Sequence, residues 1–373
     1  MRFVSTYKRK PLLLILSLML VFSLLLSACG QRQNNTSSQN NSNQQQDSGD
    51  TQQPDTSSES KDLGTATMAV SVNTLSFAPI FVAEQLGYYK EEGVDLKVIL
   101  VDGGGPAVQA LVGRSAEFAA TDSGGTTQAA EAGVDILAIQ SNVNKLTMDF
   151  VMANEDLERL GVSREDPIEK RFAALKGLTI GITSAGAATD VFTRYYLNQA
   201  GLTPEVDTKL LAIGGGPSLA AALKQGQIDG FMLSPPQPQL VEADGAGKIL
   251  ISASMGDVPG LDNFPYEVIN VRKEFAEQNP EVVRAVARAL ARANNLILDD
   301  RETAMEALQK HFSNVEPDIL SVSLDSVAAA VPRDGLMNED GWKNAVSVHL
   351  GAGMITKELD TTEGVFWTNE FLK

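Results

Sequence analysis

Residues 68–101 read MAVSVNTLSFAPIFVAEQLGYYKEEGVDLKVILV and contain the pattern that decides the fold. Apolar and β-branched residues at 68–72 predict a strand, and residues 80–89 then place apolar side chains at helical spacing. Residues 96–101 return to the strand pattern. A strand, a helix and a second strand in this order predict a βαβ unit, whose two strands lie parallel in one sheet.

The same alternation continues along the chain and divides into two series. The first series has predicted strands at 68–72, 96–101, 118–121 and 136–140 and helices at 80–89, 106–113 and 125–131. The second series has predicted strands at 178–182, 208–213, 228–233 and 249–252 and helices at 188–200, 218–225 and 237–243. A strand at 267–271 is predicted to return to the first sheet, and the chain is then predicted to be helical to its end, with helices opening at Pro280 and near 302–311, 318–328 and 338–350.

The two series echo each other in sequence. The turn at 103–106 reads GGGP, as does the turn at 214–217, and each is followed by an Ala-Leu pair. An acidic residue, Glu117 in one series and Asp229 in the other, then precedes an apolar strand. This echo predicts two similar α/β lobes that face one another.

The first 28 residues have the features of an export signal. A cationic start precedes an apolar run at 12–26, which is too short to span a membrane, and residues 26–29 read LSAC, which resembles a lipobox. We therefore expect a signal peptide at 1–28 and a diacylglyceryl anchor on Cys29, the only cysteine, which would hold the protein on the outer face of a bacterial cytoplasmic membrane. An ordinary secretory signal with an incidental cysteine is the alternative. Residues 29–63 are almost entirely polar and predict a disordered tether.

Charge and composition exclude several classes of function. The formal net charge is −17, and removal of the four cations in residues 1–28 leaves −17 − 4 = −21. A chain this acidic is not expected to bind nucleic acid. The two histidines, His311 and His349, belong to no metal-ligand spacing, so we expect neither a metal nor a cofactor. We expect a monomer.

Residues 73–94 resemble the opening of the nitrate, sulfonate, taurine and thiamine-pyrimidine group of ABC-transporter substrate-binding proteins. The resemblance extends over about residues 66–350 and is carried in order by the GGGP turn at 103–106, LKGLTIG at 175–181, QIDG at 227–230, RKEF at 272–275 and NPE at 279–281. It implies a periplasmic-binding-protein fold of type 2, with a cleft between lobe 1 (64–145 and 265–373) and lobe 2 (146–264). It also implies that the protein captures a small solute and delivers it to an ABC permease, without being an enzyme.

In such folds the ligand sits beyond the carboxyl ends of the strands, and aromatic residues beside turns could stack on it; together these two criteria select twelve candidate residues. They are Ser76, Phe77, Gly104, Asp122, Ser123, Ser184, Gly186, Ala187, Thr189, Ser234, Phe264 and Tyr266. Small residues at 183–189 would expose backbone N–H groups at a helix start, which favours an anionic head group, although a cap and a tight turn without ligand would look the same. Asp122 would instead receive an amine or a metal, or cap its helix. Aromatic side chains would stack on a ring.

We therefore expect a small anionic or aromatic-polar solute, and its class stays open between sulfonates, carboxylates, nitrate and thiamine precursors. Two other functions remain as alternatives. One is a tethered ligand sensor. The other is an enzyme like the eukaryotic thiamine-pyrimidine synthases, which use a histidine and pyridoxal phosphate, whereas both histidines here fall in C-terminal helical patterns.

Overall fold

The computed structural model describes residues 62–373, whose strands form two five-stranded sheets. The first sheet has the order β2-β1-β3-β10-β4, with β1 (Gly64–Val70), β2 (Val94–Leu100), β3 (Phe118–Asp122), β4 (Ile136–Val143) and β10 (Glu267–Arg272). The second sheet has the order β7-β6-β8-β5-β9, with β5 (Asp149–Ala153), β6 (Thr179–Ile182), β7 (Lys209–Ala212), β8 (Gly230–Leu233) and β9 (Gly247–Ser252).

The two sheets have the same topology. In each, three neighbouring strands are parallel, and the fourth position holds an antiparallel strand, β10 in the first sheet and β5 in the second. Each of these strands follows a crossing of the chain from the other sheet. This arrangement confirms the predicted fold class of two mostly parallel sheets flanked by helices.

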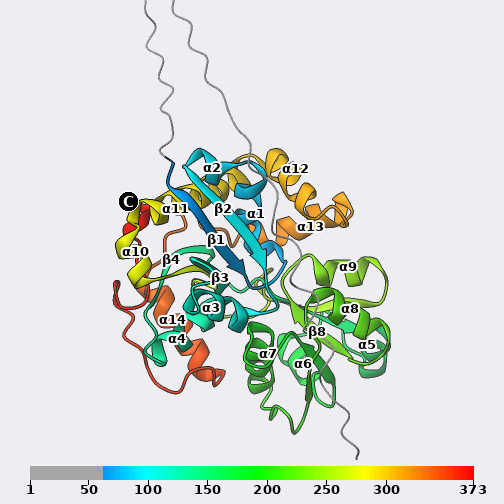
Figure 1. The fold of residues 1–373 in the computed structure, drawn as a ribbon. Helices are drawn as coiled ribbons and strands as arrows, with labels where there is room; N and C mark the ends of the chain where they lie inside the picture. The colour runs from blue at the N-terminus through cyan, green and yellow to red at the C-terminus, as the bar shows by residue number, and fades with distance from the viewer. Residues whose placement is uncertain (1–61) are drawn as a thin grey trace, which may run out of the picture. The chain divides into compact units, whose positions relative to one another are not determined.

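Helices cover both sheets (Figure 1). Those after the strands of the first sheet are η1 (Leu75–Phe77), α1 (Ala78–Gln85), α2 (Tyr88–Glu91), α3 (Gly104–Val112) and α4 (Ser123–Glu131). Those of the second sheet are α5 (Asn154–Leu160), α6 (Ile168–Ala173), α7 (Ala188–Gln199), α8 (Gly216–Lys224) and α9 (Gln237–Ala243). The C-terminal part contains α10 (Lys273–Gln278), α11 (Pro280–Asp299), α12 (Arg301–His311), α13 (Pro317–Ala328), α14 (Glu339–Gly351) and η2 (Glu370–Leu372). We call the first sheet with α1–α4 and α10–α14 lobe 1, and the second sheet with α5–α9 lobe 2.

The long helix α11 joins the C-terminal region to lobe 1. Pro280 opens it at a position where a missing N–H costs nothing. Its apolar stripe includes Val283, Val286 and Leu290, all fully buried in the main hydrophobic core, and α11 packs against α1 and α12. Removal of this stripe from water ties the C-terminal helices to the first sheet.

The acidic residues of the sequence echo have equivalent structural roles. The Oε2 atom of Glu117 accepts from the N–H of Thr67 at 2.8 Å, and the Oδ2 atom of Asp229 accepts from the N–H of Thr179 at 2.7 Å. In both lobes the carboxylate thus accepts a hydrogen bond from a backbone N–H of the central parallel strand, which is β1 in lobe 1 and β6 in lobe 2. The echo therefore marks a repeated structural unit.

The chain crosses between the sheets twice, after β4 and after β9. The two crossing segments are hydrogen-bonded to each other, with the N–H of Leu146 donating to the carbonyl of Leu261 at 3.1 Å and that of Phe264 to the carbonyl of Asn144 at 3.0 Å. A pair of linked crossovers of this kind is the structural element at which two lobes can rotate as a hinge.

The structure differs from the sequence prediction in two places. Strand β5 was not predicted, although it occupies the antiparallel position in the second sheet. The chain is not helical to its end, since beyond Gly351 it is irregular apart from η2, and Trp367 bridges to Ala138 of β4. The export signal, Cys29 and the tether up to residue 61 lie outside the described residues. None of the helices within 62–373 is both long and apolar enough to cross a membrane.

Candidate functional site

A cavity of about 180 Å³ lies where the carboxyl ends of the parallel strands of both lobes meet. Its wall is built from the turns after β1, β2 and β3 in lobe 1 and after β6, β7 and β8 in lobe 2, with the start of β10. Ligands of open α/β sheets bind at this edge, because the turns there present free backbone groups and helix starts.

Glycines shape two turns of the cavity wall, one in each lobe. Gly103 follows β2 with φ at 115°, and Gly214 follows β7 with φ at 108°, a backbone conformation that other residues rarely adopt. A Cβ atom on Gly103 would lie 3.3 Å from the hydroxyl oxygen of Ser184 in lobe 2. The absence of a side chain therefore lets the lobes approach closely.

Asp122 lies on the wall at the carboxyl end of β3 and caps helix α4. Its Oδ1 atom accepts from the N–H of Gly125, and its Oδ2 atom accepts from the hydroxyl of Thr121, both at 3.3 Å. A Cβ atom on Gly104 would lie 2.9 Å from Oδ2 of Asp122, so only glycine leaves this carboxyl its space. Burial raises the pKa of Asp122, and the hydrogen bonds from its neighbours offset this only in part.

Glu267 brings a second carboxyl to the same wall. It starts β10 directly opposite Asp122 in the antiparallel register and is only 3% exposed. Burial, and then the negative charge of Asp122, raise the pKa of Glu267 well above its usual value. The Oε2 atom of Glu267 and the hydroxyl of the adjacent Tyr266 are buried, and among the described residues neither forms a hydrogen bond of good geometry. The Tyr266 hydroxyl nevertheless lies close enough to Glu267 to offset part of the rise in its pKa. The wall thus presents unsatisfied polar atoms to the cavity.

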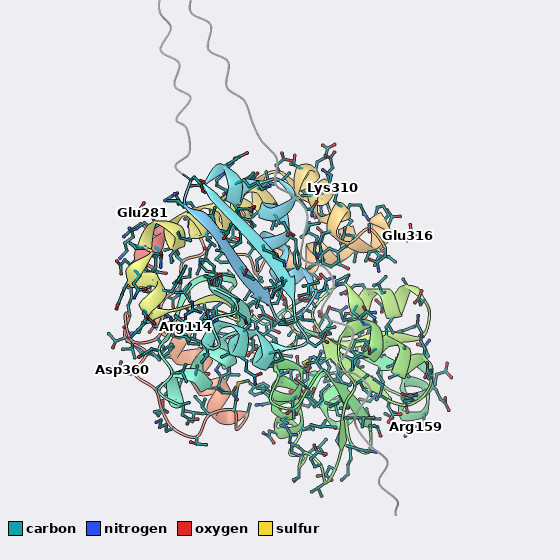
Figure 2. The ribbon with its side chains drawn as sticks, viewed as in Figure 1. Arg114, Arg159, Glu281, Lys310, Glu316 and Asp360 are labelled. Atoms are coloured by element: carbon teal, nitrogen blue, oxygen red, sulfur yellow. The ribbon has the colours of Figure 1, made fainter. Side chains whose placement is uncertain are left out.

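The described residues bring no positive side chain to the wall. Within residues 62–373, neither lysine, arginine nor histidine lines the cavity, whereas Asp102, Asp122 and Glu267 do. In Figure 2, Arg159 lies on the outer side of lobe 2 and Lys310 on the outer side of lobe 1. The cavity is therefore acidic, and apolar side chains from both lobes form much of the rest of its wall.

Hydroxyl groups define the side of the cavity formed by lobe 2. The side-chain oxygen of Thr189, in the first turn of α7, accepts from the N–H of Thr183 at 2.9 Å and lies 2.8 Å from its hydroxyl. The hydroxyl of Ser234 lies 3.0 Å from that of Thr147 in the first crossover. These contacts hold the turns after β6 and β8 in fixed positions beside the cavity.

The structure separates the twelve predicted residues into two groups. Those on the cavity wall are Gly104, Asp122, Ala187, Thr189, Ser234 and Tyr266. Those away from it are Ser76, Phe77, Ser123, Ser184, Gly186 and Phe264. Phe77 and Phe264 are fully buried in the hydrophobic core and present no face to the cavity, because both side chains turn inward from their loops.

Glu267 is a wall residue that sequence reasoning missed as a candidate. It was predicted only as the start of a returning strand, and its proximity to Asp122 depends on the β10–β3 register, which the sequence does not state. Asn73 was also missed. Its Oδ1 atom lies 2.9 Å from Nε2 of His311, whose ring stacks on Phe81 with centroids 3.7 Å apart. His311 thus holds a wall residue in place from α12.

The other histidine is structural. His349 is fully buried, its Nδ1 atom lies 3.0 Å from the hydroxyl of Thr127, and burial lowers its pKa to about 3. Across the described part of the chain, no group of three or more histidine, cysteine, aspartate or glutamate side chains is arranged to hold a metal.

The sequence of this chain is similar to a family model and to proteins of known name. The model of the NMT1-like family matches residues 63–310, more than half of the chain. The Bacillus subtilis (strain 168) protein named "Putative binding protein YtlA" is 23% identical over 296 residues, which cover 78% of this chain and 84% of YtlA. The 4-amino-5-hydroxymethyl-2-methylpyrimidine phosphate synthase of Aspergillus parasiticus is 25% identical over 325 residues, which cover 77% and 86%.

A solved structure with the same fold is the ligand-binding component of an ABC-type import system from Staphylococcus aureus with zinc bound. Its TM-score is 0.66 at 15% identity, and the alignment covers 83% of this chain and 98% of that one. These matches confirm the family resemblance and the fold expected from the sequence.

Proposed function

Because the chain belongs to the NMT1-like family, we propose that it is an extracytoplasmic solute-binding protein that captures a small molecule between its lobes and delivers it to an ABC importer. The observation that carries this proposal is the cavity itself, whose wall combines the strand-end turns of both lobes. A cavity formed in this way exists only when the lobes are together, so ligand capture and lobe closure are one event.

Direct contacts between the lobes support this arrangement. The N–H of Leu75 in lobe 1 donates to the carbonyl of Pro235 in lobe 2 at 2.7 Å, and helices α13 and α14 of lobe 1 pack against α9 and α7 of lobe 2. The main hydrophobic core also continues from lobe 1 into lobe 2, so a hinge rotation would have to break and remake both these contacts and part of this packing.

The proposed location follows from the first 63 residues. The LSAC sequence ending at Cys29 would place a diacylglyceryl group at the start of the mature chain, and the polar segment after it would serve as a tether. We propose that the protein works as a monomer on the outer face of the cytoplasmic membrane, where it meets the permease repeatedly. The names of the relatives support the importer role, since one is a binding protein and another is a component of an ABC-type import system.

Ligand capture from a mixture tests this function even though the solute is unidentified. The full-length chain in detergent is incubated with a small-molecule extract of cells, separated from free solutes and denatured, and the released compounds are identified by mass spectrometry. We expect one compound, or one chemical class, at near-stoichiometric amount. Release of no compound above the level of a non-binding control protein would argue against the proposal.

A second candidate is an enzyme, which the similarity to the pyrimidine phosphate synthase favours. The synthase branch that the sequence resembles uses a histidine with pyridoxal phosphate. Here His349 is buried against Thr127, and His311 contacts the wall residue Asn73 from behind without lining the cavity. Incubation of the protein with pyridoxal phosphate should therefore yield no pyrimidine phosphate. Its formation would establish the enzymatic function instead.

A further inference from the structure

The acidic wall of the cavity carries an inference about the ligand, which rests on the proposed solute-binding function. Asp122 and Glu267 occupy directly opposed positions on neighbouring antiparallel strands, where paired Cα atoms lie about 4.5–5.5 Å apart. Both side chains are more than nine-tenths buried, and both line the cavity. Two carboxyl groups are thus held together in a space that excludes most water.

This pair lacks the partners that buried carboxyl groups normally have. Buried acidic side chains are as a rule paired with a cation or fully hydrogen-bonded. Asp122 accepts two hydrogen bonds at 3.3 Å, but Oε2 of Glu267 accepts none, and the hydroxyl of Tyr266 beside it is also unpartnered. No cation contributes to the surroundings of either carboxyl group in the described residues.

The shape and polarity of the rest of the wall limit what can supply the missing donors. Val72, Leu100, Met148, Pro217 and Leu233 present apolar surface from both lobes. A hydrated inorganic ion would leave this surface unused, and a metal would need more oxygen ligands than two carboxyl groups provide. An organic ligand with an apolar body and a donor-rich head group satisfies both parts of the wall.

We infer that the cavity binds a small organic cation, a protonated amine or an amidinium, with its N–H groups directed at Glu267 and Asp122 and its apolar body against the opposite wall. Such a head group supplies donors to the unpartnered Oε2 atom and neutralises the carboxyl pair. An anionic head group would lie against the same two carboxyl groups with no cation to offset it, and like charges at close range in an interface cost several kcal/mol.

Ligands that share a ring and differ only in head-group charge test this inference. The full-length chain in detergent is titrated by calorimetry at pH 7.5 with benzamidine and benzylamine as cations, and with benzoate and benzenesulfonate as anions. We expect the cations to bind at least tenfold more tightly than the anions, which corresponds to about 1.4 kcal/mol.

Variants of Glu267 and Asp122 test whether these two carboxyl groups are responsible for cation binding. Glu267→Gln keeps the size of the side chain and removes its charge, and Asp122→Asn keeps a residue that can cap helix α4. Each should weaken benzamidine binding at least tenfold. The control Glu274→Gln alters an exposed carboxyl in α10 and should leave the affinity unchanged.

The pH dependence of the affinity distinguishes binding of a cation to carboxylates from binding of an anion to a neutral carboxylic acid. The titratable groups around Glu267 are Asp122 on β3, the adjacent Tyr266, and Asp102 on the same wall. Cation binding should weaken as the pH is lowered, because protons compete for the carboxylates. If Glu267 were a neutral acid donating to an anion, anion binding would instead strengthen on acidification.

The outcomes distinguish the failure of this inference from the failure of the proposed function. Tighter binding of benzoate or benzenesulfonate would overturn the inference and leave a solute-binding protein with an anionic ligand. Benzamidine affinity unchanged in both Glu267→Gln and Asp122→Asn would likewise overturn it. If none of the four compounds binds, the inference fails, and the capture of solutes from a cell extract then decides whether the proposed function also fails.

Discussion

Replacement of Glu267 by glutamine should stabilise the ligand-free protein at neutral pH. Glu267 is 3% exposed, lies opposite Asp122 across the strand pair and has a carboxyl oxygen with no hydrogen bond of good geometry among the described residues. A buried polar group left without its partner costs about 1–3 kcal/mol, and more when charged. Glutamine has nearly the same shape, carries no charge and can donate an amide N–H to the opposed Asp122, so the variant should gain about 1–3 kcal/mol of unfolding free energy.

This gain in unfolding free energy corresponds to a measurable rise in the melting temperature. With an unfolding entropy of about 2.1 cal/mol/K per residue over the roughly 310 folded residues, each kcal/mol moves the melting temperature by about 1.5 °C. We therefore expect Glu267→Gln to melt about 1.5–5 °C higher than the wild type in the absence of ligand. Thermal unfolding of the full-length chain in detergent at pH 7.5, followed by circular dichroism, measures this.

The effect should depend on pH with a defined sign. Burial and Asp122 raise the folded-state pKa of Glu267 above its ordinary value of 4.5. A raised pKa in the folded state means that folding is favoured when the group is protonated, and that this stability is lost as the pH rises through the folded pKa. The difference between Glu267→Gln and wild type should thus shrink as the pH is lowered and vanish below about pH 4.5. A variant less stable than wild type at pH 7.5, or a difference independent of pH, would refute this reasoning.

Three further outcomes are expected. Asp149→Ala should lower the unfolding free energy by about 2–3 kcal/mol, because the buried Asp149 carboxylate accepts hydrogen bonds from Gln239 at 2.8 Å and from Ser252 at 2.6 Å. Urea titration measures this free energy, and a loss below about 0.5 kcal/mol would contradict the prediction. Gly104→Val should abolish solute binding while the protein stays folded, since even a Cβ atom would meet a wall carboxyl; retained affinity would remove this turn from the site. Cys29→Ser should release the protein or leave uncut precursor, and unchanged lipid labelling would exclude the anchor.

The sequence was sufficient for most of the parallel strands because each combines a short apolar run with a following turn and helix. Strand β5 escaped detection because it is five residues long and lies in a crossover rather than in a βαβ unit. Its position is determined by pairing with β8 and β9, which follow it by dozens of residues. Such tertiary pairing leaves no local periodic signal.

The position of the cavity was predictable, but its chemistry was not. The rule that ligands lie beyond strand ends selected Gly104, Asp122 and Thr189, which all lie on the wall. It could not reveal that Glu267 stands opposite Asp122, because this depends on the register of two strands far apart in the chain. The sequence argument that favoured an anionic head group came from small residues at a helix start, and this local pattern carries no sign of the carboxyl pair.

The aromatic candidates show a second limit of prediction from the sequence. Phe77 and Phe264 flank turns, as residues of a binding site often do, yet both side chains are fully buried. Phe264 packs near Phe192 and Tyr266, with ring centroids 6.2 and 6.0 Å apart. The direction of a side chain from an irregular segment depends on backbone angles that the sequence does not specify.

A thermal-shift screen of the full-length chain against amines, amidines, amino acids, carboxylates, sulfonates, nitrate and pyrimidines, run in parallel on wild type and Gly104→Val, tests most directly whether this cavity captures a solute. At a free ligand concentration about 100 times the dissociation constant, binding adds about 2.7 kcal/mol of stability. We expect one class to raise the melting temperature of the wild type and to have no effect on Gly104→Val. No shift with any class, or an equal shift in the variant, would contradict solute capture between the two lobes.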